Sequence, residues 1–229
     1  MSSNHLSTTS SSPRQEPSRA TRAAALVTGP ALLLVGVVLM ILPGFWTLSH
    51  LVFLAGSLAM LLTGLALIGL CADRRPAWPG RTALALTAAG ALALAGQFVI
   101  DFVVIRLGDG DAEAVDRLFD RIQSAAPLDL IFYTVGPALL FTGLAVFGIL
   151  LVLRPRLQRV PGWMLVAGAS LMGVARVVES RPTEVVALAI ILIGLALTAR
   201  AAGGREGSYD VTIDRPTNTN TTAGRNAHE

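Results

Sequence analysis

Six long runs of apolar residues divide the chain, and polar or charged residues bound each run. The runs cover residues 23–42, 51–70, 82–105, 130–153, 163–178 and 183–199. A helix of about 20 apolar residues, rising about 1.5 Å per residue, spans the hydrocarbon layer of a bilayer. The runs are continuous and do not alternate with period two, which argues against a β-barrel. The pattern therefore predicts an all-α fold: a polytopic bundle of six transmembrane helices.

The segments at the two ends of the chain lack any apolar period. Residues 1–22 are rich in Ser and Thr, and residues 201–229 are rich in Gly, Thr and Asn. Such composition predicts disordered tails on either side of a transmembrane domain at residues 23–200. A secretory signal peptide is the alternative for the start of the chain. The first apolar run is longer than the 7–15 residues typical of a signal peptide, so we interpret it as a membrane helix.

The third loop, residues 108–127, differs in kind from the others because it is acidic and periodic. Val115, Leu118, Phe119 and Ile122 recur every three or four residues, with charged residues between them. This spacing places the apolar side chains on one face of a helix. It predicts an amphipathic helix that lies on the membrane surface.

The basic residues indicate how the bundle is oriented. All 18 are arginines, and they concentrate in the two tails and in the second and fourth loops. The first loop has no charge, the third is acidic and the fifth is mixed. Because cytoplasmic loops are enriched in basic residues, this alternation predicts that both tails face the cytoplasm. The net charge of +3 therefore reflects membrane orientation, and we expect no nucleic-acid partner.

Composition narrows the class and the origin of the protein. With 53% hydrophobic and 14% charged residues, the chain is too apolar for an ordinary soluble domain. A single cysteine, Cys71, excludes an internal disulfide. Arginine without lysine, together with abundant Ala, Leu, Gly and Val, is typical of a GC-rich bacterial gene. We therefore expect a bacterial protein in the cytoplasmic membrane.

A weak internal repeat relates two of the predicted spans. Residues 50–70 align without gaps on residues 129–149, and both segments contain Thr-Gly-Leu-Ala. A parallel duplication of helical hairpins would explain the match. Helices rich in Ala, Leu and Gly also align easily by chance, so both explanations stay open.

Polar residues within the predicted spans gather toward the outer ends of their helices. The candidate polar pocket consists of His50, Gln97, Asp101, Asp129 and Arg176. A charge in hydrocarbon costs at least about 2.5–3.5 kcal/mol, so such residues usually face the bundle interior and find partners. We expect Asp101 to pair with Arg176 in an outward-facing pocket that binds a cation or proton. Alternatively, these side chains reach the headgroups or form a purely structural pair.

No pattern in the sequence indicates catalysis, a cofactor or a metal. His50 has no second histidine near the bilayer with which to hold haem. The acidic residues of the third loop do not follow the order of a calcium-binding loop. The sequence indicates no histidine that could act as a general base for Ser57 or Ser170. We therefore expect a protein that is not an enzyme and that carries no cofactor.

Two functions remain after these exclusions. Short loops, small size and the absence of motifs favour a non-enzymatic accessory or scaffold protein. The alternative is a small carrier or permease with a pocket around Asp101 and Arg176. The lipid bilayer is the expected partner in both cases. An accessory role adds other membrane proteins or a second copy of the chain.

Overall fold

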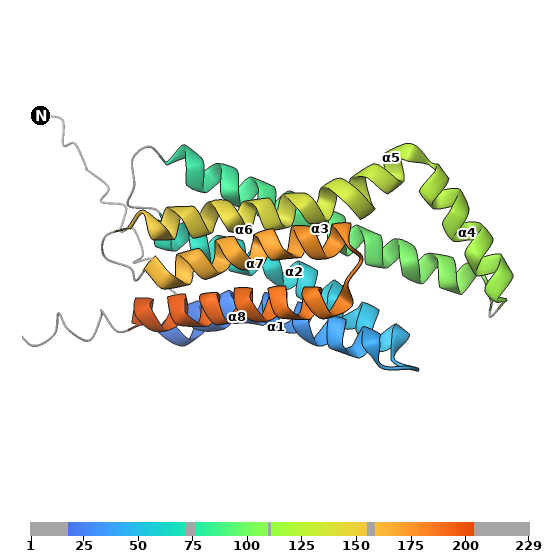
Figure 1. Ribbon diagram of the computed structural model, residues 1–229, viewed down its shortest axis with the longest axis horizontal. Helices are drawn as coiled ribbons and strands as arrows, with labels where there is room; N and C mark the ends of the chain where they lie inside the picture. Colours follow the sequence, from blue (N-terminus) through green and yellow to red (C-terminus); the bar gives the residue numbers. More distant parts are fainter. Residues whose placement is uncertain (1–17, 72–76, 110, 155–158, 204–229) are drawn as a thin grey trace, which may run out of the picture.

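The computed structural model describes residues 18–71, 77–109, 111–154 and 159–203, and within these residues all regular structure is helical (Figure 1). Six helices are long and apolar enough to cross a membrane. They are α1 (Arg19–Ile41), α2 (Trp46–Cys71), α3 (Trp78–Leu107), η1 (Asp129–Val135) continued by α6 (Gly136–Val152), α7 (Arg159–Val177) and α8 (Arg181–Gly203). The predicted all-α fold and its six apolar helices are confirmed in this part of the chain.

Several helices extend beyond the apolar runs that predicted them. The helix α1 begins at Arg19, inside the segment predicted to be disordered, because the Ser18 side chain accepts a hydrogen bond from the Thr21 backbone N–H. Similarly, α8 continues to Gly203. The rest of the two predicted tails lies outside the described residues. Helix length therefore depends here on end caps and polar turns as well as on the apolar run.

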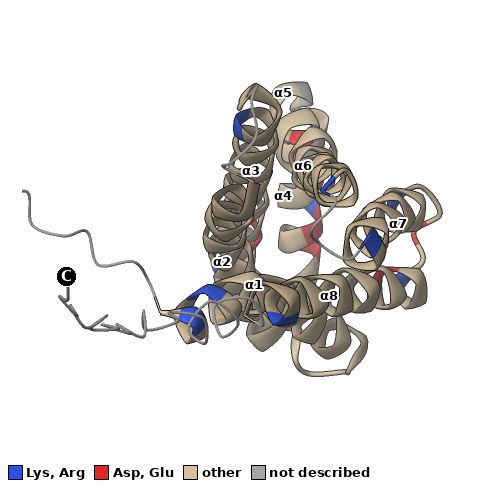
Figure 2. Ribbon diagram, turned by 90° about the vertical axis from the view of Figure 1, so that its left-hand side faces the viewer, with Lys and Arg blue, Asp and Glu red and all other residues tan. Residues whose placement is uncertain are grey.

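The six long helices form a closed ring. The order around the ring is α1, α2, α3, α6, α7 and α8, which returns to α1, and each helix packs mainly on its two neighbours (Figure 2). The largest fully buried side chains include Phe147, Leu140, Leu144, Leu165 and Ile191. Many large apolar side chains remain exposed on the bundle, for example Leu65 and Val103. An apolar outer surface is what a lipid environment permits.

The ring has two different ends. We call the end where α1, α3 and α7 finish the polar end, and the end where α1 begins and α8 finishes the tail end (Figure 1). The α1–α2 and α7–α8 connections lie at the polar end. Both described chain termini lie at the tail end. This alternation agrees with the order of spans predicted from the loops.

Glycines hold α6 and α7 together near the tail end. A Cβ atom at Gly162 would lie 2.6 Å from the Gly148 carbonyl oxygen, so only glycine permits this approach. Toward the polar end the contact is lost. A Cβ atom at Gly173 of α7 would meet no other atom within 4 Å. The two helices therefore diverge from a tight contact to an open space.

The fourth span does not begin as the regular α-helix that its apolar run predicts. Residues Asp129–Val135 form a π-helix, and the Gly136 N–H bonds the Ile131 carbonyl, five residues back. We expect Pro137 to be the physical reason, because it has no N–H for the Tyr133 carbonyl and in α geometry its ring would clash with that carbonyl. The wider turn avoids this clash and changes which side chains face the ring.

The predicted amphipathic helix is present as α4 (Ala112–Ser124), followed by the short α5 (Ala126–Leu128). Its apolar residues are half-buried, whereas most of its charged residues are exposed. The helix lies beyond the polar end in Figure 1, and in Figure 2 it is seen through the ring at the far end. It therefore crosses the polar end of the bundle. Its position on a membrane surface stays a prediction.

Candidate functional site

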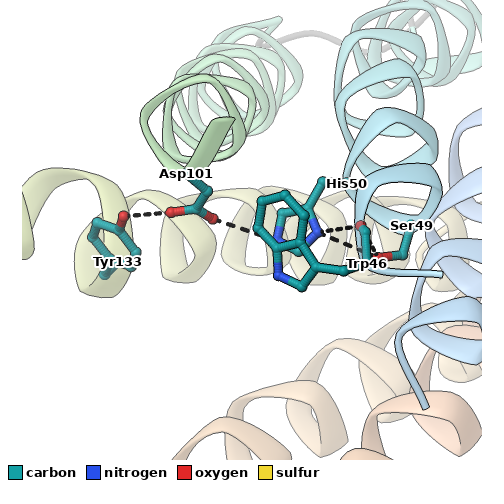
Figure 3. A network of polar contacts seen from close by, with 5 residues as sticks. All are labelled: Trp46, Ser49, His50, Asp101 and Tyr133. Carbon is teal, nitrogen blue, oxygen red and sulfur yellow. Dashed lines mark hydrogen bonds and ion pairs between the residues drawn. The ribbon is translucent and has the colours of Figure 1, made fainter. Parts of the chain in front are cut away.

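A buried histidine and a buried carboxylate meet a half-buried phenol at the polar end (Figure 3). His50 lies in the first turns of α2, Asp101 near the end of α3 and Tyr133 in η1. The Tyr133 hydroxyl donates to Asp101 Oδ1 at 2.7 Å, and His50 Nε2 lies 3.7 Å from Asp101 Oδ2. His50 is 4% exposed and Asp101 6%. Each carboxylate oxygen therefore has one polar neighbour in a site that excludes most water.

The backbone of α2 determines the hydrogen position on His50. His50 Nδ1 lies 2.8 Å from the Trp46 carbonyl oxygen, and because a carbonyl only accepts, we assign the hydrogen to Nδ1. In a neutral ring Nε2 would then turn a lone pair toward Asp101. That contact is favourable only when a proton lies on Nε2 or on the Asp101 carboxyl. The geometry therefore places His50 Nε2 and Asp101 Oδ2 in a close polar contact of 3.7 Å.

Aromatic rings hold the imidazole in this orientation. The Trp46 ring stacks on His50 with 3.8 Å between ring centroids, and Phe98 and Phe102 meet His50 edge-on. Ser49 Oγ donates to the same Trp46 carbonyl at 2.7 Å. Because the ring is packed on several sides, His50 has little freedom to turn away from Asp101.

A second charged cluster joins α7 to α8. Glu184 is buried, and its two oxygens lie 3.5 Å from Arg176 Nε and 2.8 Å from Arg181 Nη1. The expected pairing of Asp101 with Arg176 is therefore replaced by two separate clusters among the described residues. Tyr133 and His50 already occupy both oxygens of Asp101. The short connection between α7 and α8 places Glu184 beside Arg176 instead.

Two cavities open beside these clusters. The polar chamber, about 310 Å³, is lined by His50, Gln97, Asp101 and Arg176 together with aromatic residues. Four of the five residues predicted for a polar pocket therefore line one cavity. The fifth, Asp129, is half-buried at the start of η1 and lines neither cavity.

The crevice, about 930 Å³, lies between α6, α7 and α8. It shares four lining residues with the polar chamber: Gln97, Tyr133, Arg176 and Arg181. Its deeper wall reaches Ala145 and Ala169, near the glycine contact that closes α6 against α7. The cavity is therefore charged at its mouth, whereas toward mid-span its lining is uncharged and mainly apolar, with the hydroxyl groups of Thr142 and Ser170.

Two residues of the lining carry a local energetic cost. Gln97 Oε1 is buried and has no hydrogen-bond partner among the described residues, which costs about 1–3 kcal/mol. Glu179 has a φ of 52° at the end of α7, where Ser180 N–H bonds the Ala175 carbonyl. Glycine usually occupies this left-handed position. Unfavourable local conformations of this kind gather at functional sites.

Sequence reasoning did not include Tyr133, Arg181 or Glu184 in the pocket. Tyr133 depends on the π-helix, for which Pro137 was the available signal. Arg181 and Glu184 flank the start of the last apolar run, where charged residues ordinarily face water or headgroups. The i, i+3 spacing of Arg181 and Glu184 was the available signal for their contact within α8, whereas the contact of Glu184 with Arg176 emerges only from the packing of α7 against α8.

Within the described part of the chain, no three His, Cys, Asp or Glu side chains gather into a group that holds a metal ion. No protein-family model matches the chain, and no curated protein or solved structure shows significant similarity to it.

Proposed function

We propose that the protein is a small membrane carrier that admits a ligand through the polar end of the bundle. One observation carries the proposal: His50, Gln97, Asp101 and Arg176 come from three helices and line one cavity. Polar groups are costly in a membrane interior, and their convergence on a cavity is typical of a binding site. We further propose that the chain catalyses no reaction.

Each part of the site has a role in this proposal. The Asp101 carboxylate binds a cation or a proton, and the guanidinium groups of Arg176 and Arg181 attract an anionic group. The close contact between Gly148 and Gly162 closes the crevice toward the tail end, so one end is open, as in one state of a carrier. Arginines near the tail end support a cytoplasmic position for both tails in a bacterial cytoplasmic membrane.

An accessory or scaffold role is the second candidate, and α4 favours it. Arg117 bridges Glu113 at 3.1 Å and Asp111 at 3.9 Å on the exposed side of this helix. A charged surface at the end of a bundle offers a partner protein a place to bind outside the bilayer. In that case the buried clusters would serve stability alone.

Water access to the crevice distinguishes the two functions. We would replace Cys71 by Ser and introduce Gly173→Cys or Val174→Cys. Gly173 lines the crevice, whereas its neighbour Val174 is 54% exposed and lines neither cavity. The purified variants, in phosphatidylcholine nanodiscs, would react with a water-soluble maleimide. Because the reactive thiolate forms in water and not in lipid, we expect labelling of Gly173→Cys and not of Val174→Cys.

Comparison with Val174→Cys distinguishes the possible outcomes. Labelling at Gly173 alone supports a water-filled site and the carrier. Labelling at neither position shows a closed crevice and favours the accessory role. Equal labelling at both positions contradicts the proposal, because α7 would then be exposed to water on its outer face as well.

A further inference from the structure

We infer that the crevice binds a zwitterionic aminophospholipid, with its phosphate at Arg176 and Arg181 and its ammonium group at Glu179 and Gln97. This inference rests on the proposed function, because it names the class of ligand that the same crevice accepts. Three parts of the lining carry it: an arginine pair, two residues with acceptor oxygens and a mainly apolar wall.

The arginine pair provides the anion site. Buried Glu184 binds Arg176 through Nε and Arg181 through Nη1 and so holds both guanidinium groups at the mouth of the crevice. Their side chains are 41% and 48% exposed. One carboxylate against two guanidinium groups leaves an excess positive charge in this cluster. Arginine N–H groups that remain free of Glu184 match the oxygens of a phosphate.

The acceptors require a headgroup that also donates hydrogen bonds. Gln97 Oε1 is buried without a partner among the described residues, and Gln97 lines the crevice. Glu179 adds an exposed carboxylate at the mouth, in a backbone conformation that glycine would adopt at lower cost. A primary ammonium group supplies both donors and positive charge. A purely anionic headgroup would meet Glu179 unfavourably.

The apolar wall requires an acyl chain. Below the arginines the crevice is lined mainly by Phe141, Ala145, Ala169, Met172 and Gly173, and the hydroxyl groups of Thr142 and Ser170 interrupt this apolar wall. A soluble headgroup analogue would fill the mouth of the crevice and leave this wall exposed to water. The volume of about 930 Å³ lies in the range of sites that enclose a whole small ligand. The occupant is therefore a lipid, with its chain directed along α6 and α7.

Protection of a single cysteine tests the inference. Gly173→Cys, in the Cys71→Ser background, would be labelled in phosphatidylcholine nanodiscs with increasing phosphatidylethanolamine. We expect the labelling rate to fall by at least about threefold, as occupancy of two-thirds of the sites would produce. Phosphatidylglycerol and soluble phosphoethanolamine should protect less. Glu113→Cys on the exposed side of α4 is the control whose rate should not change.

Two substitutions locate the lipid. Arg176→Gln and Glu179→Gln should each reduce the protection, whereas Arg176→Lys, which keeps the charge beside Glu184, should retain part of it. Glu179 lies in an exposed turn, so Glu179→Gln tests the site even where Arg176→Gln unfolds the chain. Protection that survives Glu179→Gln and Arg176→Gln would overturn the inference.

Other results overturn the inference in identifiable ways. Equal protection by all lipids indicates a nonspecific annular lipid. Stronger protection by phosphatidylglycerol shows that negative charge alone is recognised, and protection by phosphoethanolamine shows a soluble ligand. A Gly173→Cys variant that never labels contradicts the proposed function instead. In that case, native mass spectrometry of the unmodified chain tests lipid binding by itself. Preferential retention of phosphatidylethanolamine would support the inference, and equal retention of phosphatidylethanolamine and phosphatidylcholine would overturn it.

Discussion

Asp101 is the residue on which the buried polar cluster depends. It accepts a hydrogen bond from Tyr133 and faces His50, so two side chains, from η1 and α2, contact one carboxylate of α3. A buried acceptor that loses its donor keeps the full cost of its removal from water. The effects of substitutions within the cluster should therefore depend on one another.

We expect Tyr133→Phe to lower the free energy of unfolding by about 1–3 kcal/mol, because Asp101 Oδ1 loses its buried donor. In a chain that carries Asp101→Ala, which removes the acceptor, the same substitution should cost less, by a coupling of at least about 0.5 kcal/mol. Thermal unfolding of the four variants in detergent measures both values. Additive effects of the two substitutions would contradict the contact between these side chains.

At the scale of elements, the pattern of apolar residues predicts where the helices lie but not the geometry of each helix. The runs located six long helices and the amphipathic α4, because burial and hydrogen bonding in lipid leave few alternatives to a helix. They did not locate the π-helix, because hydrophobicity does not distinguish one helical register from another. That local change places Tyr133 beside Asp101. The proposed duplication aligns the π-helix with a continuous α-helical part of α2.

Pro137→Ala tests whether proline is the cause of the π-helix. Alanine supplies the missing N–H, so we expect an α-helix to extend toward Asp129 and Tyr133 to turn away from Asp101. Tyr133→Phe should then cost less than about 0.5 kcal/mol in the Pro137→Ala background. The comparison of thermal unfolding with and without Tyr133→Phe measures this. An undiminished cost of Tyr133→Phe would show that tertiary contacts, not Pro137, maintain the π-helix.

At the scale of the whole molecule, a closed ring with one tight end creates the crevice. Gly148 and Gly162 bring α6 and α7 together, while the same helices separate around Gly173. Lipid gives no hydrophobic drive for helices to associate, so close packing of small residues has a large share in their contact. The glycines therefore differ in importance according to their place in the ring.

Gly162→Ala should destabilise the protein by about 1–3 kcal/mol, because the new methyl group would force α6 and α7 apart. Gly173→Ala is the matched control in the same helix. Its methyl group meets no atom within 4 Å, and alanine favours a helix over glycine by up to about 1 kcal/mol. In thermal unfolding in detergent, the Gly173→Ala variant should therefore be at least as stable as the unchanged chain. The reverse order would contradict this account of the α6–α7 contact.

The sequence by itself determined the helical class, the number and order of the long helices and the grouping of polar residues toward one end. These properties follow from local composition and from the length of each apolar run. It also predicted four of the residues that line the polar chamber, because charges in a membrane interior must gather.

Only the tertiary structure decided which partners these residues contact. Asp101 contacts His50 and Tyr133, and Arg176 contacts Glu184. The choice depends on the order of helices around the ring and on the π-helix, neither of which is encoded in the period of apolar residues. The crevice likewise requires the divergence of α6 from α7, a property of packing between segments and not of either segment alone.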